Sequence, residues 1–224
     1  MLLLILPAPP ALADWFSDAR AMMGTEVSVR LWSDDPEAGR LALEEVFEEA
    51  ARIDRLMSTY KDESEISKIN REAADGPVVA GDELFGLIRR ALDISVLTRG
   101  AFDITYDSVG QHYDFRSRQR PDETTVEAER ANIDYRLVIL DQAAGTVSFS
   151  KTGVRINLGG IAKGYACEAA IALLREEGVT NALVTAGGDT RLLGDRGNGP
   201  WIYVSSEVDV PSGDEVSIEL ETRN

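Results

Sequence analysis

The residues best suited to chemistry lie in one segment, INLGGIAKGYA, at positions 156–166. Its pattern predicts a strand that ends in Gly159 and Gly160 and turns straight into a helix, a geometry expected to expose backbone amides. Glycines let a ligand approach the backbone closely, and a helix N-terminus attracts anions. Lys163 in the first helical turn can neutralise such an anion. The segment therefore indicates a phosphate site, or alternatively a tight turn that carries a solvated lysine.

The glycine spacing and the charge of the chain restrict what kind of phosphate site this can be. The segment matches neither the Walker loop GxxxxGK[ST] nor the dinucleotide motif GxGxxG. With 39 Asp and Glu against 23 Lys and Arg, the 224 residues carry a formal net charge of −16. The summed field repels nucleic acids and anionic membranes, so we expect no nucleic-acid partner. A phosphate must be held locally, by amides, a lysine or a divalent cation.

The single cysteine and the single histidine narrow the chemistry further. Cys167 alone cannot form a disulfide within the chain, and one histidine disfavours a multi-histidine zinc site. We expect Cys167 to be a small packed residue, and His112 to be a surface or structural residue rather than an acid-base catalyst. Any metal is then expected to be a hard cation on oxygen ligands.

Apolar periodicity predicts the elements that position these residues. Helical spacing of apolar side chains predicts long helices over 36–57 and 82–98, a short one over 64–70, and another over 161–177. Alternation predicts a first strand over 25–32 and further strands over 136–140, 146–150, 154–158, 181–185 and 213–221. The strands of 136–158 are expected to form an antiparallel meander. Together these elements indicate an α+β fold.

Two stretches between these elements carry no strong periodicity. Residues 100–110 are expected to form a loop with embedded aromatic residues, and the charged stretch 113–130 a surface excursion. The first thirteen residues, MLLLILPAPPALA, resemble an export signal with a small-x-small cleavage site at Ala11-Leu12-Ala13, although the usual positive start is missing. The alternative is an apolar strand or helix. We expect no membrane-spanning segment, because the apolar run is too short.

Five motifs, in a fixed order along the chain, resemble the ApbE family of FAD:protein FMN transferases. They are Met23-Gly24-Thr25, MSTY with SEI over 57–66 and Asn70, GAFDIT over 100–105, INLGGIAKGYA over 156–166, and AGGD over 186–189. The resemblance implies an ApbE-like, T-fold-like domain over 14–224, with a mainly antiparallel sheet packed with helices.

The same resemblance implies an exported, Mg²⁺-dependent enzyme of the periplasm or cell envelope. Such an enzyme splits FAD, releases AMP and attaches FMN through a phosphoester to a threonine of a target flavoprotein, a subunit of a respiratory complex. A magnesium ion would also supply the positive charge that this acidic chain lacks.

The resemblance carries over to individual positions. It implies FAD contacts at Met23, Tyr60, Ala101, Phe102, Asp103, Asn157 and Lys163, and a magnesium ligand in the backbone carbonyl of Gly160. From the residues alone, Met23 and Tyr60 can equally be packing residues, and Asp103 a turn-capping carboxylate. The AGGD segment is expected either to shape the floor of the site or to form a strand-end turn capped by Asp189. No catalytic base is identified.

This chain departs from the family at four points. Many relatives have Asp and Ala where this chain has Asn157 and Gly160; a backbone ligand tolerates the second change, whereas the first removes a charge. The family's later S-G-D-Y segment, which completes the magnesium site, and its H-I-x-D-P stretch have no match here. We therefore expect a chain that lacks the C-terminal metal-binding segment and has weak or no transferase activity. The alternatives are an FAD-binding module without transfer, and a poorly folding incomplete chain.

Overall fold

A computed structural model describes residues 14–114, 117–197, 199–204 and 217–220 of the chain. The expected export signal at 1–13 lies outside these residues. The chain divides into two compact units, which are described separately. Unit 1 comprises the residues up to Ala51 and those from Lys163 onward, and unit 2 comprises Arg52–Ala162.

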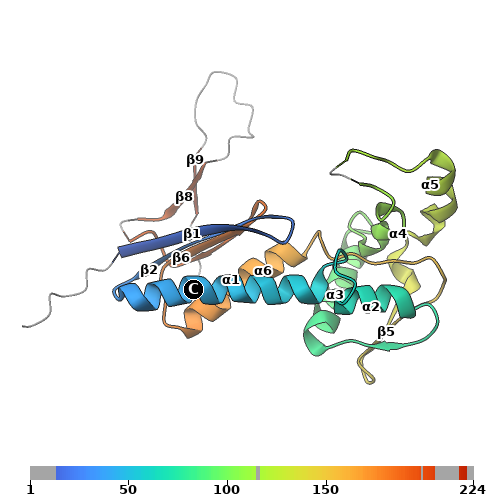
Figure 1. Ribbon diagram of the computed structural model, residues 1–224, viewed down its shortest axis with the longest axis horizontal. Helices are drawn as coiled ribbons and strands as arrows, with labels where there is room; N and C mark the ends of the chain where they lie inside the picture. Colours follow the sequence, from blue (N-terminus) through green and yellow to red (C-terminus); the bar gives the residue numbers. More distant parts are fainter. Residues whose placement is uncertain (1–13, 115–116, 198, 205–216, 221–224) are drawn as a thin grey trace, which may run out of the picture. The chain divides into compact units, whose positions relative to one another are not determined.

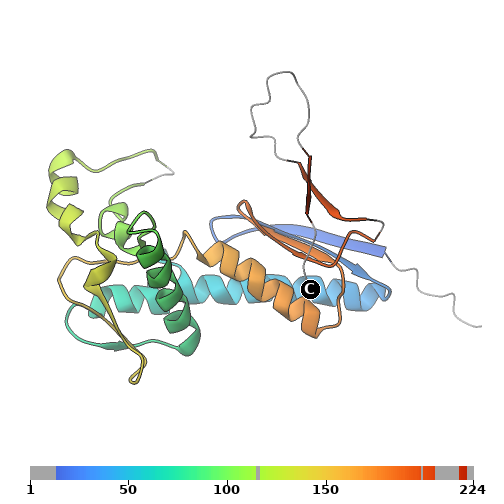
Figure 2. The same cartoon turned by 180° about the vertical axis from the view of Figure 1, so that it is seen from behind.

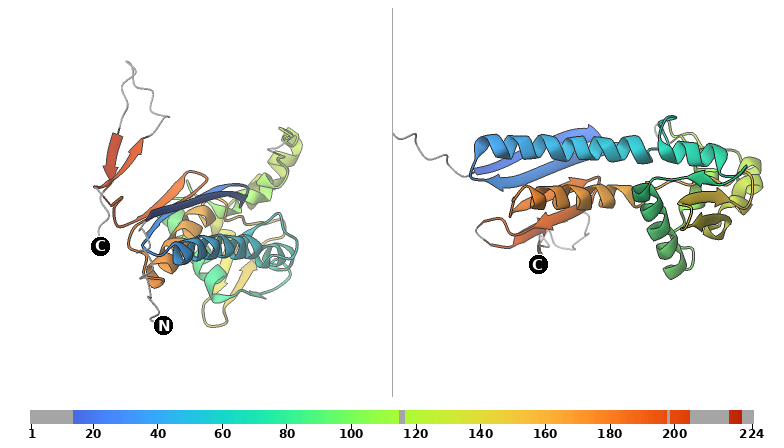
Figure 3. Two further views of the ribbon diagram at one scale, coloured as in Figure 1. Left: turned by 60° about the vertical axis from the view of Figure 1, so that its left-hand side comes forward. Right: turned by 90° about the horizontal axis from the view of Figure 1, so that it is seen from below.

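Unit 1 is built on a four-stranded antiparallel sheet in the order β1-β2-β6-β7 (Figure 1). Its strands are β1 (Asp14–Met22), β2 (Thr25–Ser33), β6 (Ala182–Ala186) and β7 (Asp189–Leu193). The first part of α1 (Pro36–Met57) and α6 (Ala162–Glu176) lie side by side against one face of this sheet (Figure 3). A separate pair, β8 (Trp201–Val204) and β9 (Ser217–Leu220), is also antiparallel.

The core of unit 1 follows from the two periodicities seen in the sequence. Val27, Val29 and Leu31 alternate along β2 and are at most 2% exposed. They form one cluster with Phe47 of α1 and Leu174 of α6. Burial of each such side chain contributes roughly 1.5–3 kcal/mol, so this shared core fixes the two helices on the sheet.

Unit 2 contains several helices (Figure 2). They are combined with a small antiparallel sheet in the order β3-β5-β4. Its strands are β3 (Val78–Val79), β4 (Val138–Asp141) and β5 (Thr146–Phe149), and its helices are α2 (Glu65–Glu72), α3 (Asp82–Leu97), α4 (Asp107–Gly110) and α5 (Glu123–Glu129). Three 3₁₀ turns are also present, at Ile104–Tyr106, Arg130–Asn132 and Tyr135–Leu137. The α+β class with antiparallel sheets is thus confirmed.

The prediction of a strand over 154–158 is wrong, although the segment is extended and its apolar residues are buried. The Asn157 amide donates to the Ile104 carbonyl (2.9 Å), and side chains supply the other partners that a neighbouring strand would offer. The Asn70 amide nitrogen donates to the Ile156 carbonyl (2.9 Å), and its oxygen accepts from the Ile156 amide (2.8 Å). The Arg155 amide donates to the Ser108 hydroxyl (3.0 Å). Because these groups satisfy the buried backbone, no sheet forms here.

The remaining differences concern short or weakly apolar elements. The first strand of the described residues is β1 rather than the predicted 25–32 strand, and the sequence pattern does not predict β3 or β7. Residues 100–110, predicted as a loop, contain a 3₁₀ turn and α4, while the charged stretch 113–130 contains α5. Among the described residues, no helix combines the length and apolar character needed to cross a bilayer.

The role of Asn70 generates a stability prediction. Asn70→Ala should lower the free energy of unfolding by about 2 kcal/mol or more, because it leaves both backbone groups of buried Ile156 without their partners. Urea denaturation followed by circular dichroism measures this loss. Gln142→Ala, at an exposed position, should shift the free energy by less than about 0.5 kcal/mol. Equal effects of the two substitutions would contradict the assigned role.

Candidate functional site

The turn at Gly159 and Gly160 is held mostly by internal hydrogen bonds. The Gly159 amide donates to the side-chain oxygen of Asn157 (2.8 Å). The amides of Ile161 and Ala162 both donate to the Leu158 carbonyl, at 2.8 and 2.7 Å. The expectation that this turn exposes free amides is therefore wrong for these three groups, because a side chain and a preceding carbonyl already accept from them.

Gly160 is the open residue of the turn. It is exposed, and no hydrogen bond within the described part of the chain engages its amide or its carbonyl. A Cβ at this position would lie 3.1 Å from the ring of Phe102, so a side chain here would crowd that ring. Gly160 therefore offers backbone polar groups to a ligand beside an aromatic surface.

Phe102 reaches the turn from the loop after α3. Arg99 and Gly100 both have positive φ, 55° and 83°, which reverses the chain at the end of the helix. The Phe102 amide then donates to the Thr98 hydroxyl (3.0 Å), while neighbouring Ala101 is exposed. The structure thus places Phe102 against Gly160 and leaves Ala101 on the surface next to it.

Asp103 is occupied by structural contacts. Its carboxylate accepts from the Thr105 amide (2.8 Å), the Thr105 hydroxyl (2.6 Å) and the Tyr135 amide (2.9 Å). It caps the 3₁₀ turn Ile104–Tyr106. This geometry matches the capping role that the sequence left open, and an FAD contact of Asp103 stays a prediction.

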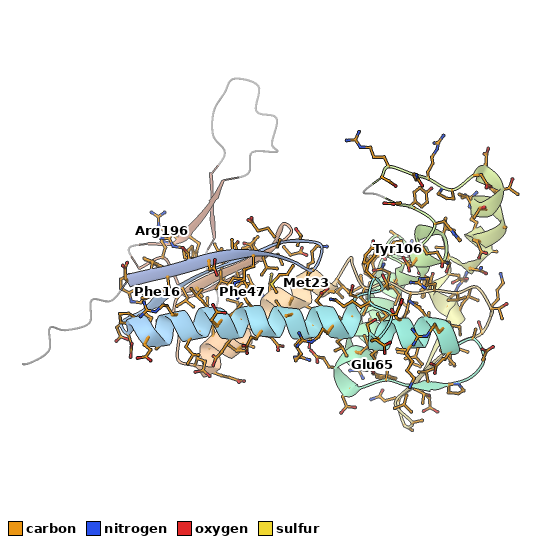
Figure 4. The ribbon with its side chains drawn as sticks, viewed as in Figure 1. Phe16, Met23, Phe47, Glu65, Tyr106 and Arg196 are labelled. Atoms are coloured by element: carbon orange, nitrogen blue, oxygen red, sulfur yellow. The ribbon has the colours of Figure 1, made fainter. Side chains whose placement is uncertain are left out.

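Two tyrosines lie near the turn. Tyr60 is 87% exposed, so it is not a core residue. Tyr106 is 41% exposed, and its hydroxyl lies 3.7 Å from the position that a Cβ of Gly159 would take (Figure 4). Burial, Asp107 and Tyr60 together raise the pKa of Tyr106 to about 12. Tyr106, which the sequence did not single out, is therefore a protonated phenol beside the turn.

The Asn157 side chain uses both of its hydrogens within unit 2. It donates to the Thr59 hydroxyl (3.1 Å) and to the Asp107 carboxylate (3.1 Å). Asp107 is 5% exposed, and its other oxygen accepts from the Arg155 guanidinium (2.7 Å). Sequence reasoning missed Asp107 and Arg155, since nothing near either residue marks it as buried or paired.

In unit 1, Met23 occupies the turn between β1 and β2 (Figure 4). Met23 and Gly24 have φ of 53° and 73°, the positive values that a two-residue hairpin turn requires. Methionine rarely adopts this left-handed conformation, whereas Gly and Asn adopt it readily. The partly buried Met23 thus lies at the tip of the hairpin in a left-handed backbone conformation that is unfavourable for methionine.

Lys163 lies beside the glycine turn between β6 and β7. A Cβ at Gly187 would lie 2.8 Å from the Thr25 hydroxyl and 2.9 Å from the Lys163 side chain, and Gly187 has a φ of +56°. Asp189 is close to Gly164 in the first turn of α6, as a Cβ there would lie 3.9 Å from its carboxylate. The segment is a strand-end turn. Because Gly187 has no side chain, Lys163 and Thr25 can pack against its backbone.

Cys167 and His112 have the surroundings expected of a packed and of a surface residue. Cys167 is 1% exposed, its Sγ lies 3.5 Å from the Asp189 carbonyl, and burial followed by the nearby Asp189 charge raises the thiol pKa to about 11. A neutral, buried thiol is a poor nucleophile, which agrees with a packing role. His112 is exposed on the surface of unit 2.

The described residues do not by themselves fit a magnesium site. The free Gly160 carbonyl is a suitable oxygen ligand, but no group of three or more His, Cys, Asp or Glu side chains among the described residues is placed to hold a metal. Mg²⁺ prefers carboxylates in an octahedral arrangement. No reaction step is therefore assigned to a metal here.

Comparison with known proteins gives consistent results. The family model described as "ApbE family" matches residues 23–218. An FAD:protein FMN transferase of Treponema pallidum is 30% identical over 187 residues, covering 80% of this chain and 52% of that protein. One from Klebsiella pneumoniae is 28% identical over 182 residues, covering 80% and 56%. The chain thus spans about half the length of the curated relatives it matches.

Solved structures share the fold. An ApbE protein from Thermotoga maritima has a TM-score of 0.81 and 30% identity, covering 92% of this chain and 68% of that one. The flavin transferase ApbE from Vibrio cholerae has a TM-score of 0.79 and 24% identity, covering 93% and 68%. The second likeness concerns the fold alone.

The raised pKa of Tyr106 predicts a pH effect. Tyrosine ordinarily ionises near pH 10, so between about pH 10 and 12 the unfolded chain loses this proton while the folded chain keeps it. Stability should fall as pH rises through this window, and Tyr106→Phe should weaken that fall. Unfolding midpoints measured across the window test this. Gln142→Ala, which removes no ionisable group, should leave the slope unchanged, and a Tyr106→Phe slope identical to wild type would reject the assignment.

Proposed function

Because the chain belongs to the ApbE family, we propose that it binds FAD and transfers the FMN portion to a threonine of a target protein. The observation that carries this proposal is the open turn at Gly160, whose backbone groups have no hydrogen-bond partner among the described residues and lie beside the Phe102 ring. The family match and the 30% identity to an FAD:protein FMN transferase support it.

The proposed nucleotide contacts follow the chemistry of the residues present. Exposed Tyr60, with Tyr106 and Phe102, offers aromatic surface for the flavin or adenine ring. The Gly160 amide offers a hydrogen bond to a phosphate oxygen. Lys163, in the first turn of α6, supplies the positive charge that an acidic chain needs to hold a pyrophosphate. A nucleotide contact of Met23, which belongs to unit 1, is proposed separately and from the motif alone.

The transfer itself is a phosphoryl exchange. The threonine oxygen forms an ester bond to the FMN phosphorus while the pyrophosphate P–O bond breaks, AMP leaves, and the hydroxyl proton passes to solvent. A bound Mg²⁺, for which the described residues offer only the Gly160 carbonyl, would neutralise charge on the pyrophosphate oxygens. The alternative function is FAD binding without transfer, which the absence of a converging ligand group among the described residues favours.

The location and the partner of this enzyme are part of the proposal. We propose export through the apolar segment 1–13, with cleavage after Ala13, to the periplasm or cell envelope. The partner is a flavoprotein subunit of a respiratory complex that carries the acceptor threonine. N-terminal sequencing of the chain recovered from an expressing cell envelope tests the export proposal, and an uncleaved cytoplasmic product would reject it.

Incubation with FAD, Mg²⁺ and a target domain carrying the acceptor threonine tests the transfer. We expect FAD binding, seen as quenched flavin fluorescence, and only weak covalent FMN labelling of the target by mass spectrometry, because the described residues include no cluster of metal ligands. The same target with its threonine changed to Val is the control. Binding without labelling would select the FAD-binding module, and no binding would reject both functions.

Lys163→Ala should weaken FAD binding about 10- to 100-fold, because a charge-assisted hydrogen bond contributes roughly 1.5–3 kcal/mol. Lys163→Arg keeps the charge and should recover most of the affinity. Fluorescence titration measures both, with Lys151→Ala, at an exposed position, as the matched control. Unchanged affinity in Lys163→Ala would show that this lysine does not contact the pyrophosphate.

A further inference from the structure

We propose that Asp107 is a positioning residue for the nucleotide site, acting through Asn157 on the Gly159–Gly160 turn. This inference rests on the proposed function, since the turn is the proposed phosphate contact. Asp107 itself is not placed against the ligand. Its carboxylate belongs to a residue that is 5% exposed, and it faces Asn157 and Arg155 inside unit 2.

The contacts form a continuous chain from Arg155 to the turn. The Arg155 Nε donates to one Asp107 oxygen (2.7 Å), and the other oxygen accepts from Asn157 Nδ2 (3.1 Å). With its nitrogen held by Asp107 and Thr59, Asn157 turns its oxygen toward the Gly159 amide, which donates to it at 2.8 Å. Asp107 therefore decides which way the Asn157 amide faces.

The orientation of Asn157 matters for what the turn presents. With the oxygen toward Gly159, that amide is satisfied internally, and the next residue, Gly160, is left open within the described part of the chain. The reverse orientation would point the Asn157 NH₂ group at the Gly159 N–H, donor against donor, and the turn would have to change to relieve it. Asp107 thus favours the one arrangement in which Gly160 is presented.

The ion pair with Arg155 explains how a carboxylate is tolerated near a phosphate site. Arg155 is the more exposed partner of the pair, with 27% of its side chain exposed against 7% for Asp107. The guanidinium neutralises the carboxylate, so Asp107 orients Asn157 without adding net negative charge beside an anionic ligand. An unpaired carboxylate at this place would repel a pyrophosphate.

A swap of the two side chains tests the inference. Asn157→Asp places two carboxylates in contact and should weaken FAD binding about tenfold or more. In Asp107→Asn, the new amide has one oxygen to accept from two donors, Arg155 and Asn157, so one of these donors loses its acceptor. FAD binding should weaken less in this variant than in Asn157→Asp. In the double variant the amide at position 107 can accept from Arg155 and donate to the carboxylate at position 157, which still accepts from Gly159. Affinity should then return to within about threefold of wild type. The net charge of the chain is unchanged by the swap.

The measurements are fluorescence titrations with FAD at mildly alkaline pH, where the two carboxylates of Asn157→Asp are least able to share a proton. The temperature is kept far below the thermal unfolding midpoint of every variant, so that each protein is folded. Asp93→Asn, an exposed charge change on α3, is the matched control and should bind as wild type does. If the single variants lose stability but bind FAD as wild type does, Asp107 is merely structural and the inference is wrong. Failure of the double variant to recover also overturns it.

A second readout separates this inference from the proposed function. The amide proton of Gly159 is observed by NMR without ligand, and its shift and temperature dependence report the bond to Asn157. We expect the signal to move in Asn157→Asp and to return in the double variant. If wild type fails to bind FAD, the proposed function falls, and this signal alone decides whether Asp107 positions the turn; an unmoved signal rejects it.

Discussion

The segment 154–158 crosses the interior of unit 2 without a neighbouring strand, and the candidate site depends on how that constraint is met. Buried backbone groups must find partners, and here side chains supply most of them: Asn70 for Ile156 and Ser108 for Arg155, while the Asn157 amide donates to the Ile104 carbonyl. Side-chain partners fix one register only. The segment therefore delivers Asn157 and the glycines after it to a defined place, as a sheet would, while it leaves the approach to the turn open.

The elements that local periodicity defines could be predicted from the sequence, and so could the residues of the glycine turn. The long helices and β2 each bury a continuous apolar face, a property readable in any window of the chain. The alternation of Val154, Ile156 and Leu158 is equally clear, yet it predicts a strand, because the partner that replaces the sheet is one amide 86 positions away. The alternation of apolar residues predicts which side chains are buried, but it does not predict which groups form hydrogen bonds with the backbone of the segment.

The other misses have the same cause. β1 is an edge strand with charged Asp18 and Arg20 and no fully buried residue, so its pattern is weak. Asp107 looks like any turn aspartate in the sequence, and its partner Arg155 lies 48 positions away. Conversely, Asp103 is a candidate ligand by motif, while its three accepted hydrogen bonds show a capping carboxylate. Motifs select candidate residues for a site, and the structure shows which of them, such as Asp103, already hold the surrounding backbone in place.

The hairpin at Met23 has an evolutionary consequence. A left-handed backbone at a non-glycine residue costs roughly 1 kcal/mol, which Asn or Gly at the same place would largely avoid. Selection for thermostability alone would thus replace this methionine in a laboratory evolution experiment, whereas selection for the proposed FAD binding would keep it, since Met23 contacts the nucleotide in that proposal. On the proposed function, position 23 is therefore a place where folding and function compete for one side chain, and the residue that survives records which pressure was applied.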